Sequence, residues 1–328
     1  MTGASHRPRL IAIVGPTATG KSALAVALAA RLGGEVVSCD STAVYRGFDI
    51  GTDKPPLASR GGVPHHLIDV ADPTERYSAA RYVREASAAI RAITGRGRMP
   101  ILAGGTGLYF RALTRGLFDG PGRNEAVRCR LNGVAERRGD AWLHRMVARV
   151  DPAAGQRIQL HDRKRLIRAL EVYFLTGRPL TEHFAATRRP LSEYDLMTFG
   201  LRLPPAETAR RVSERVDRQF DGGLLDEIRS MLASGLPPSA HPFTGLVYRQ
   251  ALEHLNGVRD EAATRALITQ ENRRYARRQL IWFRKEPNVH WLAHPGDRPE
   301  ALEEALAQVD RPEMTLTMRG SLEGRASA

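Results

Sequence analysis

Apolar residues in the first third of the chain alternate between short continuous runs and helical periodicity. "RLIAIVG" (9–15) predicts a buried strand, residues 22–32 predict an alanine-rich helix, and "GEVVSCDS" (34–41) predicts a second strand that ends at Asp40. "MPILAGGTGLYFRAL" (99–113) repeats the order of strand, glycine turn and helix. Strands that alternate with helices favour a parallel sheet with helices on both faces. Polar groups that follow such strands are expected to converge at one edge of the sheet.

The strand pattern disappears from the sequence between about 121 and 195, where the periodicity is helical. Asp162 is the expected N-cap of "DRKRLIRALEVYFLTG", and Gly177 with Pro179 is expected to end that helix. A strand is expected again at "YDLMTFGLRLP", and three helical stretches follow it. They span residues 205–220, 224–234 and 260–285.

These patterns predict a core domain that is interrupted by a helical insertion. Small, polar residues dominate the last part of the chain, which is expected to be disordered. The predicted parts are a first core segment (1–120), a basic helical insertion (121–195), a second, mostly helical core segment (196–310) and a tail (311–328).

The first glycine turn, "GPTATGKS", matches the spacing of phosphate-binding loops. Its glycines let backbone amides turn toward a polyphosphate, and the N-terminus of the following helix adds partial positive charge. Lys21 is expected to reach the phosphates and the Ser22 hydroxyl to hold Mg²⁺. The loop therefore predicts a P-loop NTPase-like fold. The expected diphosphate- or nucleotide-binding residues are Gly15, Pro16, Thr17, Ala18, Thr19, Gly20, Lys21 and Ser22.

Basic residues outnumber acidic ones, with 49 Arg and Lys against 36 Asp and Glu, a formal net charge of +13. The stretch 121–190 carries a large part of that excess, and "ENRRYARRQLIWFRK" (271–285) is a second basic segment. A polyanionic partner such as nucleic acid would explain these segments. From charge alone, arginine-rich helical faces in contact with solvent explain them equally well.

Candidates for membrane insertion or disulfide formation are not apparent in the sequence. We find no run of about 20 apolar residues and no signal-peptide pattern. The two cysteines, Cys39 and Cys129, have neither metal-binding nor disulfide spacing. We therefore expect a cytoplasmic protein.

Seven segments, taken in order, resemble the tRNA dimethylallyltransferases, which are also called tRNA isopentenyltransferases. They are "GPTATGKS", "VVSCDSTAVYRGFDIGTDKP", "PHHLID", "PILAGGTGLYFRAL", "DRKRLIRALEVYFLTGRPL", "RVDRQFDGGLLDEI" and "NRRYARRQLIWFRK". The resemblance covers about residues 9–292. The sequence shows no zinc-finger-like Cys/His extension and in this respect resembles the bacterial form of the family. It implies transfer of a dimethylallyl group from dimethylallyl diphosphate to the N6 amine of the adenosine 3′-adjacent to the anticodon. The phosphate loop would then hold the leaving diphosphate, with Mg²⁺.

The resemblance also implies roles for particular residues. Asp40 would be the general base that accepts the amine proton, Thr106 would help to orient the amine, and Arg215 would lie near the diphosphate. From the residues alone, Asp40 and Thr106 are explained as caps of a turn and of a helix. The residues that would contact tRNA are Asp40, Ser41, Thr42, Ala43, Thr106, Arg128, Lys164, Arg165, Leu166, Ile167 and Arg168. A monomer without an obligate protein partner or membrane contact is expected.

The chain departs from the family pattern at two places. Ala43 stands where many members have Gln, so a side-chain hydrogen bond to the nucleotide is expected to be missing. The usual "AIGY" is replaced by "TGLVY" (244–248), which moves the glycine away from Tyr248. The backbone of this segment therefore cannot be transferred from the family.

Three other functions compete with tRNA prenylation. An isopentenyltransferase that acts on free adenine nucleotides would not need the basic insertion. A P-loop small-molecule or nucleotide kinase would turn over ATP without a prenyl donor. A non-enzymatic RNA-binding protein would not depend on Asp40.

Overall fold

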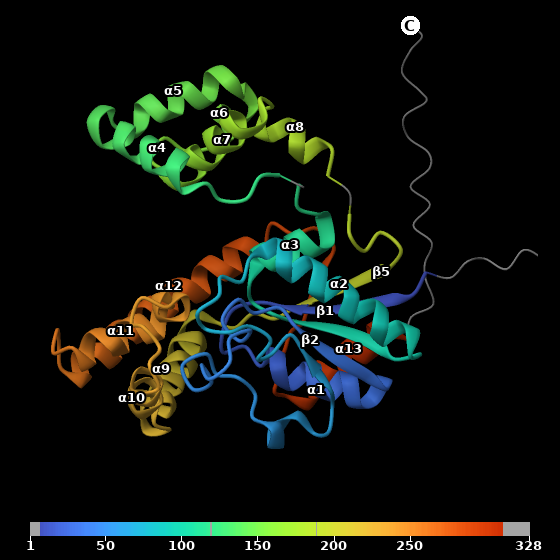
Figure 1. Ribbon diagram of the computed structural model, residues 1–328. Coiled ribbons are helices and arrows are strands. Elements are labelled where there is room, and N and C mark those ends of the chain that lie inside the picture. Colours follow the sequence, from blue (N-terminus) through green and yellow to red (C-terminus); the bar gives the residue numbers. More distant parts are fainter. Residues whose placement is uncertain (1–6, 119, 188, 311–328) are drawn as a thin grey trace, which may run out of the picture. The chain divides into compact units, whose positions relative to one another are not determined.

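The computed structural model describes residues 7–118, 120–187 and 189–310 (Figure 1). The chain divides into two compact units. The first combines the residues up to 78 with 88–109 and those from 193 onward, and the second holds 79–87 and 110–192. The predicted disordered tail (311–328) lies outside the described residues.

A six-stranded sheet forms the centre of the first unit, in the order β3-β2-β4-β1-β5-β6. Every neighbouring pair is parallel, as expected for a P-loop NTPase-like fold. Five of the six residues of β1 are buried, because both neighbours and both faces of this strand are covered. The strands are β1 (Arg9–Val14), β2 (Gly34–Ser38), β3 (His65–His66), β4 (Met99–Gly104), β5 (Asp195–Gly200) and β6 (Val289–Trp291).

Helices of the first unit lie against this sheet and beside it. Helix α1 (Lys21–Leu32) and helix α13 (Pro299–Val309) share one apolar core with β1, to which Ile11, Leu24 and Ala301 contribute. Four other helices of the unit pack together, each against the next one along the chain, and α12 also packs against α9. They are α9 (Pro205–Asp221), α10 (Leu224–Ala233), α11 (Leu246–Leu255) and α12 (Glu261–Phe283). Figure 1 shows α9–α12 as a group of packed helices.

The division of the chain into two units falls within two further helices, α2 (Ala79–Gly95) and α3 (Gly107–Arg115). Two short 3₁₀ helices complete the first unit, η1 (Leu57–Arg60) and η2 (His241–Thr244). Among the described residues, no helix has the length and apolar character that crossing a membrane requires.

The second unit is helical. Its core is formed by Leu131, Leu143, Leu166 and Leu170, which are at most 5% exposed. The side chain of Asp162 accepts a hydrogen bond from the Arg165 amide, and Gly177 ends the same helix with a left-handed φ of 70°, so both predicted caps are confirmed. The helices are α4 (Glu125–Arg138), α5 (Asp140–Val150), α6 (Pro152–Arg157), α7 (Arg163–Thr176) and α8 (Leu180–Ala185).

Candidate active site

A cavity of about 540 Å³ opens at the carboxyl ends of the central strands, within the first unit. The phosphate loop, the turn after β2, the segment 51–55, and parts of α9, α11 and α12 line it. Residues far apart in the sequence therefore meet where an α/β sheet ordinarily binds its ligand. Its polar lining includes Thr17, Lys21, Ser22, Asp40, Ser41, Thr42, Asp53, Lys54, Arg215, Asn272, Tyr275, Arg278 and Gln279.

The phosphate loop is folded tightly between β1 and α1. Gly15 has a φ of 145°, and a Cβ there would lie 2.5 Å from the carbonyl oxygen of Leu201, so only glycine fits. Gly20 also has positive φ and precedes the first turn of α1. The Thr19 hydroxyl donates to the carbonyl of Pro16 at 2.9 Å. This bond joins two residues of the loop that lie between its two glycines.

Lys21 lines the cavity and donates from Nζ to the carbonyl oxygen of Pro16 at 2.5 Å. Burial lowers the pKa of this ammonium, and the charge of Arg215 lowers it further. Asp40 and Asp53 act in the opposite direction, and the result is a pKa of about 8. A diphosphate would raise this pKa again, because an anion favours the charged form of a lysine.

Arg215, on α9, is far from the phosphate loop in the sequence but lines the same cavity. One of its nitrogens, Nη1, donates to the Thr17 hydroxyl and lies 3.3 Å from a carboxylate oxygen of Asp53. The other, Nη2, donates to the carbonyl of Thr52 at 3.3 Å. Two cationic side chains, Lys21 and Arg215, therefore border the phosphate loop, which is the charge pattern that a diphosphate requires.

Asp40 follows β2, which ends at Ser38, two residues earlier than the sequence predicts. The chain turns there because Asp40 Oδ1 accepts hydrogen bonds from the amide and hydroxyl of Thr42, at 2.8 and 2.6 Å, and from the Ala43 amide at 3.3 Å. Within the described part of the chain, Oδ2 has no such partner. Asp40 therefore caps the turn with one oxygen and can present the other to the cavity.

Thr106 ties the segment after β4 to the turn after β2. Its hydroxyl accepts from the Ser41 amide at 3.0 Å and lies 3.4 Å from the Ser41 hydroxyl. Its amide donates to the carbonyl of Cys39 at 3.2 Å. Unlike Ser41 and Asp40, Thr106 is absent from the cavity lining.

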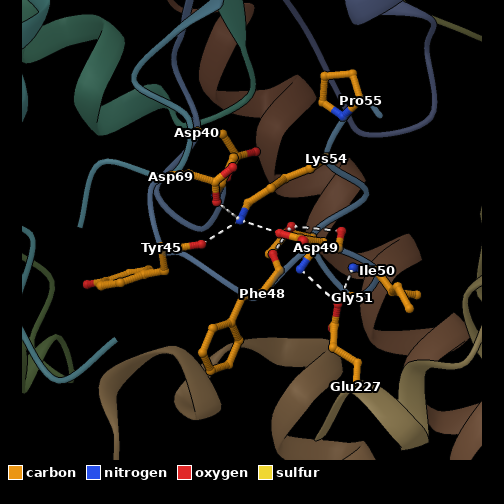
Figure 2. Close-up of polar contacts among 12 residues, drawn as sticks. Asp40, Tyr45, Phe48, Asp49, Ile50, Gly51, Lys54, Pro55, Asp69 and Glu227 are labelled. Carbon is orange, nitrogen blue, oxygen red and sulfur yellow. Dashed lines mark hydrogen bonds and ion pairs between the residues drawn. The ribbon is translucent and has the colours of Figure 1, made fainter. Parts of the chain in front are cut away.

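Lys54 anchors the segment that follows the Asp40 turn, residues 45–54 (Figure 2). Its side chain is 4% exposed, and Nζ donates to the carbonyl of Tyr45 and to Oδ1 of both Asp49 and Asp69, at 2.5, 2.7 and 2.5 Å. All three donors of the ammonium are thus used. Lys54 lies in the segment "GTDKP" (51–55), and no local sequence pattern indicates this role for it.

Tyr248 holds the same segment from α11. Its hydroxyl donates to Glu227 Oε1 and accepts from the Gly51 amide at 3.0 Å, and burial, with Glu227, raises its pKa. A Cβ on Gly51 would lie 2.6 Å from the ring of Tyr248. Gly245, the displaced glycine of "TGLVY", has a φ of −62°, which any residue can adopt. The φ of Gly245 therefore does not require glycine, although a Cβ there would lie only 3.0 Å from the carbonyl oxygen of Pro242.

Ala43, the other departure, is buried and lines the cavity. Its amide belongs to the Asp40 turn. The methyl group offers no hydrogen bond, so the polar groups beside it in the lining are those of its neighbours in the turn, such as Ser41 and Thr42.

The residues expected to contact tRNA in the second unit differ in their surroundings. Arg128 and Arg168 form ion pairs with Glu171, whose side chain is fully buried, while Lys164 and Arg165 are exposed. Leu166 and Ile167 belong to the core of the unit, with 0% and 4% exposure. Side-chain contacts along this run would therefore come from its basic residues.

The donor groups of the cavity can be compared with what a divalent metal ion bound beside phosphate oxygens needs. Ser22 is exposed in the cavity lining, and its hydroxyl has no hydrogen-bond partner within the described residues. The described part of the chain contains no group of three or more His, Cys, Asp or Glu residues that could bind a metal ion without further ligands. Mg²⁺ commonly takes one or two protein ligands and completes its shell with phosphate oxygens and water. The donor set is therefore compatible with Mg²⁺.

Comparison with known proteins places the chain in a family. The family model "IPP transferase" matches residues 43–286, and "Isopentenyl transferase" matches residues 8–62. The tRNA dimethylallyltransferase of Anaeromyxobacter dehalogenans (strain 2CP-C) is 48% identical over 298 residues, 90% of this chain and 97% of its own length. The tRNA dimethylallyltransferase 1 of Trichlorobacter lovleyi is 45% identical over 289 residues, covering 88% and 95%.

Solved structures agree with this placement. The full-length tRNA isopentenylpyrophosphate transferase from Bacillus halodurans is 38% identical, with a TM-score of 0.64 over 87% of this chain and 89% of its own. A eukaryotic dimethylallyltransferase acting on tRNA is 26% identical, with a TM-score of 0.76 over 94% of this chain and 81% of its own. The resemblance seen in the sequence is thereby confirmed, and the chain belongs to the IPP transferase family, whose relatives here are named tRNA dimethylallyltransferases.

Proposed function

We propose that this enzyme transfers a dimethylallyl group from dimethylallyl diphosphate to the N6 amine of the adenosine 3′-adjacent to the anticodon of tRNA. The observation that carries the proposal is the single cavity in which the phosphate loop, Lys21 and Arg215 border the same space as Asp40. A group that binds a leaving diphosphate and a group that takes a proton are thus available to one reaction. Because the substrate is tRNA, we expect the enzyme to act in the cytoplasm, as a monomer.

In this reaction the lone pair of N6 attacks C1 of the dimethylallyl group while the bond from C1 to the diphosphate oxygen breaks. Lys21 and Arg215 stabilise the negative charge that grows on the diphosphate as it leaves with the bonding electrons. Mg²⁺, held by Ser22 and the diphosphate oxygens, would supply further positive charge. Asp40 Oδ2 accepts the proton that N6 loses, and Oδ1 keeps the carboxylate in place through the Thr42 bonds.

The adenine must leave its stack in the anticodon loop before it can reach Asp40. We assign Ser41, Thr42 and Ala43 to its contacts, since they line the cavity beside Asp40. Thr106 would act on the same base through Ser41, to which its hydroxyl is bonded. We assign tRNA contacts outside the cavity to the basic residues of the second unit.

A tRNA prenylation assay tests the proposal. Labelled dimethylallyl diphosphate, Mg²⁺ and unmodified tRNA are incubated with the wild-type protein and with Asp40→Asn, whose Oδ1 can still accept from Thr42. We expect label in tRNA and a 10²- to 10⁴-fold slower variant, roughly the contribution of general base catalysis.

AMP as the acceptor, and ATP without a prenyl donor, serve as parallel reactions. Label in AMP alone would support the nucleotide-prenylating alternative, and ATP turnover would support a kinase. Absence of label from tRNA with folded wild-type protein, or full activity of Asp40→Asn, would contradict the proposal.

A further inference from the structure

Gln279, on α12, joins the two loops that the proposed reaction must hold together. Its side chain is 8% exposed and lines the cavity. Oε1 accepts from the amide of Thr17 in the phosphate loop, and Nε2 donates to the carbonyl of Gly105, each at 2.9 Å. Gly105 directly precedes Thr106, so one side chain bridges segments 262 and 174 residues away from it in sequence.

The bridge depends on both ends of the amide. Thr17 offers a donor and Gly105 an acceptor, so the side chain must present an oxygen to one and an N–H group to the other. Glutamate would lose the donor, and methionine, which has a similar shape, would lose both groups. Tyr275, one turn earlier on α12, lines the same cavity.

Gly105 is packed against the same amide. A Cβ at this residue would lie 2.3 Å from Gln279 Nε2 and 3.3 Å from the carbonyl oxygen of Gly15. A side chain on Gly105 would therefore push the amide of Gln279 away from its hydrogen bonds. Because the two residues lie so close, a substitution at Gln279 and a substitution at Gly105 can each test the bridge.

We propose that Gln279 is a positioning residue that fixes the separation between the diphosphate-binding loop and the loop that orients the amine. The proposal rests on the proposed function, because it concerns two substrates that must meet. Attack requires the amine nitrogen and C1 within roughly 3–3.5 Å, and a misplacement of about 1 Å can slow such a reaction by about 100-fold. Each substrate would still bind without Gln279, since Lys21 and Arg215 remain in place for the diphosphate and the basic residues assigned to tRNA lie in the second unit.

Gln279→Met is the first test. We expect kcat to fall about 10- to 100-fold, while the KM for tRNA and the affinity for inorganic diphosphate change less than about threefold. Gln250→Met is the matched control, since Gln250 is also buried (4% exposed), hydrogen-bonded to Glu271 and Arg259, and absent from the cavity lining. We expect this control to keep the wild-type kcat. A wild-type kcat for Gln279→Met, or an equal loss in the control, would overturn the proposal.

Gly105→Ala should give the same loss of kcat, because the new Cβ displaces the amide of Gln279. In the double variant Gly105→Ala/Gln279→Ala the 2.3 Å clash with the amide is absent, and the remaining 3.3 Å contact with the Gly15 carbonyl oxygen needs only a small shift, so kcat should be close to that of Gln279→Ala alone. Multiplied losses in the double variant would contradict a shared cause.

Amide hydrogen exchange provides a readout that does not depend on activity. Gln279→Met should raise exchange in residues 15–20 and 103–107 together, and leave the strands β5 and β6 unchanged. If the wild-type protein fails to prenylate tRNA, the proposed function is wrong, and this experiment still decides whether Gln279 couples the two loops. Unchanged exchange in either loop would overturn the coupling.

Discussion

Glu171 lies at the centre of a buried charge network in the second unit, and its replacement gives the sharpest test of how that unit is stabilised. Its carboxylate accepts from the Asn124 amide at 2.8 Å, from Arg128 at 2.8 and 2.9 Å, and from Arg168 at 2.7 Å. Burial opposes ionisation, but the bonds from Arg128, Asn124 and Arg168 outweigh it and lower the pKa of Glu171 from 4.5 to about 2.

This pKa difference converts into a contribution to stability. The change from 4.5 to about 2 corresponds to roughly 3 kcal/mol at neutral pH. Because the folded-state pKa is the lower one, the contribution is complete above the unfolded-state pKa and disappears as the pH falls toward 2. About 1 kcal/mol of it should be lost at pH 4.

Glu171→Gln removes the charge and turns part of the carboxylate into a donor that faces two arginines. We expect the free energy of opening of α4 and α7 to fall by roughly 3 kcal/mol at pH 7, which corresponds to about 100-fold faster amide exchange. At pH 4 the ratio of variant to wild-type exchange should be about fivefold smaller. Hydrogen exchange with mass spectrometry on the full chain measures both quantities.

Glu182→Gln is the matched control, because Glu182 forms an exposed ion pair with Arg178 in the same unit. Such pairs contribute about 0–1 kcal/mol, so its exchange should stay close to that of the wild type. Equal exchange in Glu171→Gln and wild type would refute the reasoning, as would a ratio that is the same at pH 7 and pH 4.

Two further predictions concern the phosphate loop. With a pKa of about 8, Lys21 should take up a proton when inorganic diphosphate binds above that pH, and affinity should fall by up to about tenfold per pH unit. Calorimetry in buffers of different ionisation enthalpy measures this uptake, and its persistence in Lys21→Arg would assign it to another group. Asp53→Asn should bind inorganic diphosphate about three- to tenfold more tightly, since the half-exposed carboxylate of Asp53 competes for Arg215. Weaker binding in the same titration would instead make Asp53 a residue that orients Arg215.

Much of the fold could be predicted because its signals are local. The strand at β1, the phosphate loop and helix α1 are adjacent in the sequence, and each has a pattern of its own. Strands β3 and β6 were missed, since they have only two and three residues and alternation needs more. The helices α2, α11 and α13 were missed as well, although their lengths of 17, 10 and 11 residues are ordinary.

The candidate site could be predicted only in part, for the same physical reason. Lys21 and Asp40 are marked by neighbours in the sequence, whereas Gln279 and Lys54 act through contacts that only the folded chain creates. A buried Gln in an arginine-rich helix gives no signal of its own. The partner of Gln279 is an amide of Thr17, 262 residues earlier, and no local pattern contains that information.

The role of the basic residues in the insertion could not be decided from the sequence, because charge alone does not show which of them are paired within the folded unit. The sequence offered two explanations, a nucleic-acid contact or a solvated arginine face. Arg128 and Arg168 form ion pairs with the buried Glu171, so their charge is largely neutralised within the unit.

Arg165 is exposed and pairs with Asp162, and the remaining donors of its guanidinium can still reach a phosphate. Lys164 is exposed and has no ion pair within the described residues, so its full charge faces solvent. If tRNA binds this run, Lys164 and Arg165 should therefore account for most of the salt dependence, and the loss of Arg128 should act through stability.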